Sequence, residues 1–202
     1  MSDALERGLT WYESGAGPAP DPEVCATRDV FQARLDSLLR QLLRDGWVAD
    51  DAALLVAVLG EVGNNSFDHN LGQWPDVPGC WLGREPDPAS EPHPSRFWVL
   101  DRGVGILATL RRADPALTTP QQAVDASFTR VLSGRTPERR GNGLKFVRSV
   151  VNGNAQRGLL CQSGGGRASF GGRLGSLTAA DGRLGATTAP GVAVLLAWSP
   201  GS

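Results

Sequence analysis

Residues 54–70 read LLVAVLGEVGNNSFDHN, an apolar run that passes directly into a polar one. The apolar residues recur at helical spacing, and Asp50 and Asp51 suit a first helical turn, where carboxylates interact favourably with the helix dipole. We therefore expect one helix that contains both runs. Because its first half is the most apolar helical segment of the chain, we place it against a sheet.

The polar half of this helix carries a row of three side chains. Glu61, Asn65 and His69 are spaced four residues apart and so lie on one face. A carboxylate and an amide oxygen one turn apart suit Mg²⁺, and a glutamate beside such an ion can orient or deprotonate a water molecule. A solvated helix face is the alternative. Gly63 and the asparagines of the stretch count against it, because they are poor helix formers.

A second candidate feature follows a predicted strand. Residues 96–100, RFWVL, are apolar and aromatic enough for a strand, and DRGVG comes directly after them. Gly103 and Gly105 would let the backbone approach a ligand closely, and the Asp101 carboxylate can accept a hydrogen bond from an exocyclic amine such as that of adenine. Taken alone, the pattern is also typical of an ordinary turn.

A third candidate feature opens a predicted helix. The sequence GNGLK comprises Gly141, Asn142, Gly143, Leu144 and Lys145. The free N–H groups and the positive dipole end of the helix that follows suit a phosphate. Arginines precede this stretch, so a solvated basic loop and a nucleic-acid patch are the alternatives, but the glycines favour a small anion. The better-known nucleotide motifs GxGxxG and GxxxxGK[ST] are absent.

The length, composition and net charge of the chain limit the class of protein. A chain of 202 residues with 41% apolar content is long enough for one packed domain. A net charge of −1 gives no electrostatic reason to expect nucleic acid or a membrane surface as partner. The start of the chain lacks the pattern of a secretory signal, and no apolar run approaches the roughly 20 residues that span a bilayer. We expect a cytoplasmic protein.

The rest of the chain completes the predicted fold. Residues 1–20 are expected to be a flexible tail, and residues 21–199 a single domain. Further helices and strands alternate irregularly, which favours a two-layer α/β sandwich whose mixed, largely antiparallel sheet carries helices on one face. The expected helices span 31–42, 106–113, 119–131 and 144–152, the expected strands span 80–82, 158–163, 167–171 and 191–198, and residues 171–189 are expected to form a long loop.

The three candidate features resemble a known family. ExxxN with a following His, then DxGxG, then GxGL are similar to the N, G1 and G2 boxes of the GHKL (Bergerat-fold, HATPase-like) ATP-binding superfamily. That superfamily includes gyrase, histidine kinases and the anti-sigma-factor serine kinases, and the stand-alone serine kinase or ATPase domains are closest in kind. The resemblance spans about residues 22–199 and implies the Bergerat fold.

The resemblance implies roles for the residues that would contact the adenine base and the Mg²⁺ ion. Asn65 matches the asparagine that binds Mg²⁺, and Asp101 matches the aspartate that reads adenine. Gly103 and Gly105 match the glycines of the G1 box. The family's last box is usually Gly-Thr, whereas Val192 follows the glycine here, so the threonine that supports the adenine contact is not identified.

The resemblance also implies roles at the phosphates. Glu61 matches the general base of the ATPase branches, and His69 is expected to lie near the phosphates. Gly141 and Gly143 match glycines of the lid that covers the phosphates, and we expect Asn142, Leu144 and Lys145 to contribute to the same site.

These roles imply an Mg²⁺-dependent ATP-binding domain. It would hydrolyse ATP, or transfer the γ-phosphate to a partner protein in bacterial-type regulation. ATP and ADP are the expected ligands, the partner protein is unidentified, and a homodimer is left open. The alternative is a nucleotide-gated binding module, in which ATP orders the lid and creates a docking surface with little or no turnover.

Overall fold

A computed structural model describes residues 2–14, 23–86, 95–130 and 142–199. Within these residues the chain forms a six-stranded sheet in the order β1-β2-β3-β6-β4-β5. The strands are β1 (Val24–Cys25), β2 (Cys80–Pro86), β3 (Ser95–Asp101), β4 (Arg157–Ser163), β5 (Gly166–Gly171) and β6 (Val192–Trp198). All five pairs of neighbouring strands are antiparallel. The predicted α/β class is confirmed, whereas the mixed pairing that we expected is wrong for the described strands.

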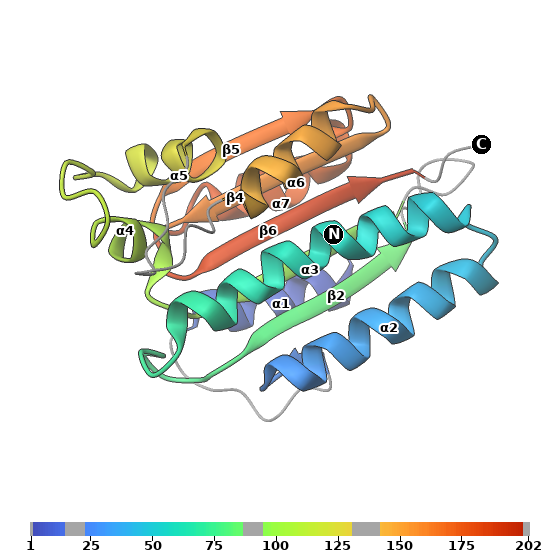
Figure 1. The fold of residues 1–202 in the computed structure, drawn as a ribbon, viewed down its shortest axis with the longest axis horizontal. Coiled ribbons are helices and arrows are strands. Elements are labelled where there is room, and N and C mark those ends of the chain that lie inside the picture. Colours follow the sequence, from blue (N-terminus) through green and yellow to red (C-terminus); the bar gives the residue numbers. More distant parts are fainter. Residues whose placement is uncertain (1, 15–22, 87–94, 131–141, 200–202) are drawn as a thin grey trace.

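Helices pack on both faces of this sheet. In Figure 1, α2, α3, α5 and α6 lie in front of the strands, and α1 and α7 lie behind them. The helices are α1 (Asp3–Glu13), α2 (Arg28–Arg44), α3 (Ala49–Asn70), α4 (Gly105–Leu110), α5 (Pro120–Thr129), α6 (Gly143–Asn152) and α7 (Thr178–Leu184), with a 3-10 helix, η1 (Leu174–Leu177). The expectation of helices on one face alone needs correction, because a second buried cluster lies under α1, η1 and α7.

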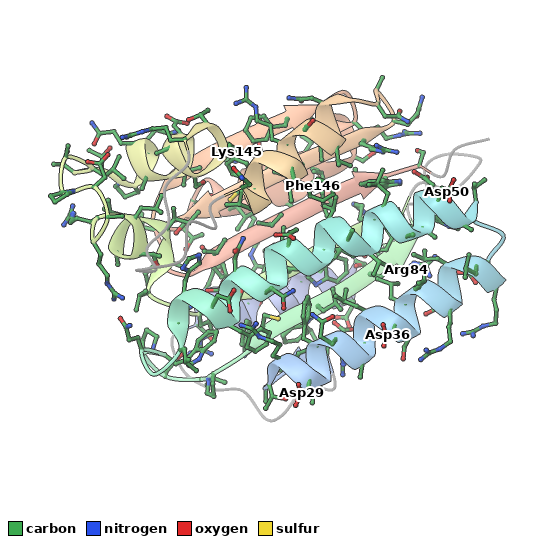
Figure 2. All side chains as sticks on the ribbon, in the orientation of Figure 1. Asp29, Asp36, Asp50, Arg84, Lys145 and Phe146 are labelled. Carbon is green, nitrogen blue, oxygen red and sulfur yellow. The ribbon has the colours of Figure 1, made fainter. Side chains whose placement is uncertain are left out.

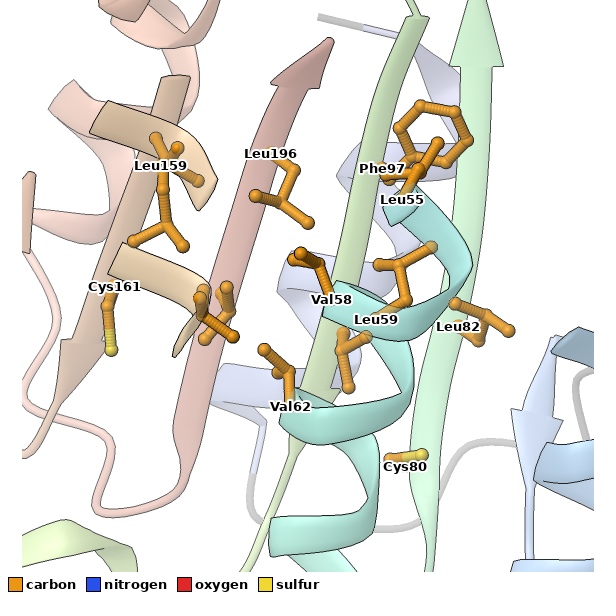
Figure 3. Packing of buried hydrophobic residues seen from close by; sticks show 14 of the residues in the cluster. Leu55, Val58, Leu59, Val62, Cys80, Leu82, Phe97, Leu159, Cys161 and Leu196 are labelled. Carbon is orange, nitrogen blue, oxygen red and sulfur yellow. The ribbon is translucent and has the colours of Figure 1, made fainter. Parts of the chain in front are cut away.

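Helix α3 fixes the position of the candidate site. Its apolar side chains at Leu55, Val58, Leu59 and Val62 point toward the middle of the sheet (Figure 3), and each is at most 5% exposed. Burying such a side chain contributes roughly 1.5–3 kcal/mol. The predicted helix over the apolar and polar runs is therefore confirmed, and its apolar half packs against the sheet as expected.

A close contact with α2 sets how α3 is turned about its axis. The ring of Phe31 on α2 fills the space beside Gly63, where an added Cβ would lie 2.0 Å from the ring Cζ atom. Phe31 is fully buried and packs its ring at 5.9 Å from that of Phe67. Gly63 is thus a packing residue, which explains why a poor helix former lies in the middle of α3.

The flexible tail expected over residues 1–20 is wrong for residues 3–13, which form α1. Ser2 accepts a hydrogen bond from the backbone N–H of Leu5 at 3.2 Å and so caps the helix. Leu5 and Leu9 are buried against the rear of the sheet with Trp98 and other aromatic residues. The sequence of α1 is amphipathic, and its apolar face accounts for this packing.

The loop expected over residues 171–189 also needs correction, because η1 and α7 occupy its middle. Leu177 and Leu184 from this segment are buried in the same cluster as α1. The other predicted helices and strands are present with shifted ends. Among the described residues, none of the helices is long and apolar enough to cross a membrane.

Candidate functional site

A cavity of about 310 Å³ lies between α3, the loop after β3 and the start of α6. Its floor comes from strands β4 and β6. The lining residues are Arg28, Glu61, Val62, Asn64, Asn65, Ser66, Asp68, His69, Asn70, Asp101, Gly105, Ile106, Thr109, Leu110, Ser127, Asn142, Gly143, Leu144, Cys161, Val192 and Val194. The three features singled out in the sequence therefore meet in one cavity.

The predicted row on α3 lines this cavity. We call Glu61, Asn65 and His69 the outer row, because Glu61 is exposed and the other two are partly exposed. Two neighbouring polar residues also line the cavity but are bonded to α2: Asp68 pairs with Arg28, and Asn64 accepts a hydrogen bond from Gln32 at 3.1 Å. Asn64 thus lies to the side of the outer row.

A second row, one residue further along α3, is buried. We call Val62, Ser66 and Asn70 the inner row; each is at most 5% exposed. Asn70 donates to the carbonyl of Ser66 at 2.8 Å and accepts from the backbone N–H of Val104 at 2.8 Å. Its amide therefore fastens the loop after β3 to the helix.

Asp101 is the most constrained carboxylate of the site, at 2% exposed. Its Oδ2 accepts from the Ser66 hydroxyl at 2.7 Å, and its Oδ1 accepts from the backbone N–H groups of Gly103 at 2.8 Å and Val192 at 3.2 Å. Burial raises the pKa of Asp101 above its ordinary value, and these three hydrogen bonds oppose the rise. Both oxygens of the carboxylate are thus fixed in place.

The glycines of the DxGxG motif allow close backbone approach. Gly105 has φ +82°, and an added Cβ there would lie 2.0 Å from the carbonyl oxygen of Pro190. An added Cβ at Gly103 would lie 2.2 Å from the Asn70 amide. We expected these glycines to let the backbone approach a ligand, whereas the close neighbours of both glycines in the structure are protein atoms.

The hydroxyl group that bonds to Asp101 comes from α3 and not from the segment before β6. Val192 lines the cavity at the position where the resembling family has threonine, and it contributes a backbone N–H to Asp101. Thr187 instead accepts a hydrogen bond from the N–H of Ala189 at 3.2 Å. Ser66, to which the sequence interpretation gave no role, supplies the hydroxyl next to Asp101.

The start of α6 forms the opposite end of the cavity. Asn142, Gly143 and Leu144 line it, whereas Lys145 lies on the next position of α6 (Figure 2) outside the lining set. An added Cβ at Gly143 would lie 2.3 Å from Oε2 of Glu61, so the carboxylate lies beside the start of the helix. Gly141 lies outside the described residues.

The donors present fit the Mg²⁺ ion that the sequence implies. Glu61 and Asn65 bring a carboxylate and an amide oxygen to the same cavity. Within the described part of the chain, no group of three or more His, Cys, Asp or Glu side chains could hold a metal ion. An ion here would therefore take its other ligands from water and from a bound phosphate, as Mg²⁺ commonly does.

The floor of the cavity is apolar and includes one thiol. Cys161 is fully buried, and burial together with the charge of Asp101 raises the pKa of this thiol to about 12. Val194 lies beside it on β6, so this part of the floor offers apolar surface rather than a reactive group.

Comparisons of the sequence with models of protein families and with curated proteins find no match.

Proposed function

We propose that this cavity binds an adenine nucleotide with Mg²⁺, and that the protein hydrolyses ATP or transfers its γ-phosphate to a partner protein. The hydrogen bonding of Asp101 carries the proposal. Oδ1 already accepts two hydrogen bonds, so only Oδ2, which accepts one, has capacity left for a base. A single remaining acceptor suits the amine of adenine, whereas guanine offers two neighbouring N–H donors and would need both oxygens.

The two ends of the cavity suit the two ends of a nucleotide. Ser66 contacts Asp101 at one end, and Glu61 lies beside Gly143 at the other. These two residues of α3 are five positions apart, a rise of about 7.5 Å along the helix. A base at Asp101 would therefore place its phosphates near the N terminus of α6, whose dipole favours anions.

The outer row supplies the chemistry in this proposal. Asn65 would hold Mg²⁺, which when bound neutralises charge on the phosphates. Glu61, exposed at the phosphate end, can accept a proton from a water molecule or from a partner's hydroxyl group. Asn142 and Gly143 present the start of α6 to the same region.

One contact favours the second candidate function, a nucleotide-gated binding module. The Glu61 carboxylate lies against Gly143, so a phosphate that entered there would displace the carboxylate or shift the start of α6. Such a shift would change the surface formed by α6, on which Phe146 is 39% exposed (Figure 2). In that case nucleotide binding would control partner binding without requiring turnover.

A thermal-shift titration with Mg²⁺ and ATP, ADP or GTP tests the binding proposal. We expect ATP and ADP to raise the melting temperature of the parent, GTP to have little effect, and Asp101→Asn to abolish the response to ATP. Asp36→Ala, at an exposed acid on α2, is the control and should respond like the parent. Absence of stabilisation by any adenine nucleotide would overturn the proposal.

Phosphate release under multiple turnover separates the two candidate functions. Glu61→Ala should lower the turnover rate by about 10²-fold, because it removes a general base, while ATP affinity changes by less than about three-fold. If the parent and Glu61→Ala release phosphate at the same rate while ATP still binds, Glu61 is not catalytic and the binding module is the better account.

A further inference from the structure

Helix α1, behind the sheet, reaches the base end of the cavity through one hydroxyl group. Tyr12 is 3% exposed, and its hydroxyl lies 3.1 Å from the carbonyl oxygen of Ala189 and 3.3 Å from that of Gly191. Its proton is shared between these two acceptors. The hydroxyl therefore braces the short segment that leads into β6.

That segment forms part of the Asp101 site. An added Cβ at Gly191 would lie 2.0 Å from the carbonyl oxygen of Asp101, so the two backbones are in close contact. The next residue, Val192, donates its N–H to Oδ1 of Asp101 and is the register partner of Asp101 in the β3–β6 pair. Any shift of Gly191 would consequently misalign one of the three donors to this carboxylate.

Helix α1 is held firmly enough to act as a support. Arg183 from α7 pairs with Glu6 and Glu13, and it donates to the hydroxyl of Thr10 at 2.9 Å. Gly8 lies against the rear aromatic residues, with an added Cβ 3.2 Å from Nε1 of Trp98. The position of Tyr12 is thus set by contacts on the rear face, remote from the cavity.

The electrostatic surroundings keep the Tyr12 hydroxyl protonated. Burial raises the pKa of Tyr12 well above its ordinary value, and the negative charge of Asp101 raises it further. The group therefore remains a hydrogen-bond donor at any ordinary pH, as its two carbonyl neighbours require.

We propose that Tyr12 is a positioning residue for base recognition, and that docking of α1 on the rear face is coupled to the nucleotide site through the 189–192 segment. The part of this inference that concerns nucleotides rests on the proposed function. The part that concerns the strand does not, because Tyr12 and Val192 are linked through protein atoms alone.

Amide hydrogen exchange without nucleotide tests the link directly. Tyr12→Phe keeps the ring and removes the hydroxyl, and we expect the Val192 amide to exchange about five-fold faster. Thr129→Val removes an exposed hydroxyl on α5 that donates to the carbonyl of Asp125, and it leaves α1 and the 189–192 segment untouched, so its Val192 amide should exchange as in the parent. Unchanged exchange at Val192 in Tyr12→Phe would overturn the inference, whatever the ligand of the cavity.

Affinities for ATP and for purine riboside triphosphate, which lacks the 6-amino group, test the coupling to recognition. Tyr12→Phe should weaken ATP binding about five-fold and binding of the analogue less than two-fold, because only ATP uses Asp101. A purely structural role would weaken both equally, and that result would count against positioning. If the parent binds neither nucleotide, the proposed function fails, and the exchange measurement alone decides the role of Tyr12.

Discussion

The outer and inner rows of α3 lie one residue apart on the same helix, yet they differ in burial and in their hydrogen-bond partners. The inner row is buried, and its polar members Ser66 and Asn70 are bonded to Asp101 and to the loop after β3. The outer row lines the same cavity but is more exposed. The inner row therefore holds Asp101 and the loop after β3 in place, and the outer row lines the cavity that we propose as the nucleotide site. Substitutions in the two rows should separate stability from binding.

The largest expected effect on stability comes from a substitution at Gly63, because its contact with α2 sets how α3, which carries both rows, is turned about its axis. Gly63→Ala places a Cβ 2.0 Å from the Phe31 ring, and such overpacking should lower the free energy of unfolding by about 1–3 kcal/mol. Gly60→Ala is the matched control, because its nearest neighbour is 3.6 Å away. It should stabilise the helix by about 0.5–1 kcal/mol. Urea unfolding of both variants measures the difference, and equal effects would contradict the packing role of Gly63.

Asparagine-to-alanine changes at Asn65 and Asn70 compare the two rows directly, with Asn64, which lies to the side of the outer row, as a control. Asn70→Ala leaves the N–H of Val104 without its acceptor and should cost about 2 kcal/mol in urea unfolding. Asn64→Ala, which removes only an exposed contact with Gln32, should change stability by less than about 0.5 kcal/mol. Asn65→Ala should be equally mild in stability but should weaken Mg²⁺-dependent nucleotide binding. A stability loss at Asn65 that matched the loss at Asn70 would erase the distinction between the rows.

A smaller effect is expected at Ser66. Ser66→Ala removes the donor to Oδ2 of Asp101 and should cost about 1 kcal/mol in unfolding free energy. Ser37→Ala, on the exposed face of α2, is the control and should be nearly neutral. If the two serine variants unfolded alike, the hydroxyl beside Asp101 would have no structural value.

The smallest effect is the pH dependence that Asp101 imposes. Its pKa is raised in the folded protein above the ordinary 3.8, so folding favours the protonated carboxyl. The stability contributed by that proton is complete below pH 3.8 and is lost as the pH rises through the folded-state pKa. The parent should therefore lose stability relative to Asp101→Asn as the pH rises through this range. Unfolding of both proteins at several pH values measures this difference, and a gain by the parent would contradict it.

Sequence patterns predicted which residues line the candidate site better than they predicted the hydrogen bonds that hold those residues in place. The spacing of Glu61, Asn65 and His69 predicted the outer row, because helical periodicity depends only on local sequence. Ser66 and Asn70 show the same four-residue spacing, but their partners Asp101 and Val104 lie more than 30 residues away. Nothing local in the sequence indicates such pairings.

The N-terminal helix was missed for a related reason. Residues 3–13 carry an amphipathic pattern, but the tryptophans that cover its apolar face come from β2 and β3. No partner for this pattern lies nearby in the sequence. The contact of Tyr12 with Gly191, across nearly the whole described chain, was likewise beyond local inference.

The strand order also has a consequence for how the protein is made. Strand β6 is the last of the described strands along the sequence, yet it lies in the middle of the sheet between β3 and β4. During synthesis, neither β3 nor β4 can gain its central neighbour until residues 192–198 have left the ribosome. The third donor to Asp101 arrives with the same strand. The nascent chain therefore cannot complete the Asp101 end of its cavity until β6 emerges, so we expect the proposed nucleotide to bind only after the sheet has closed.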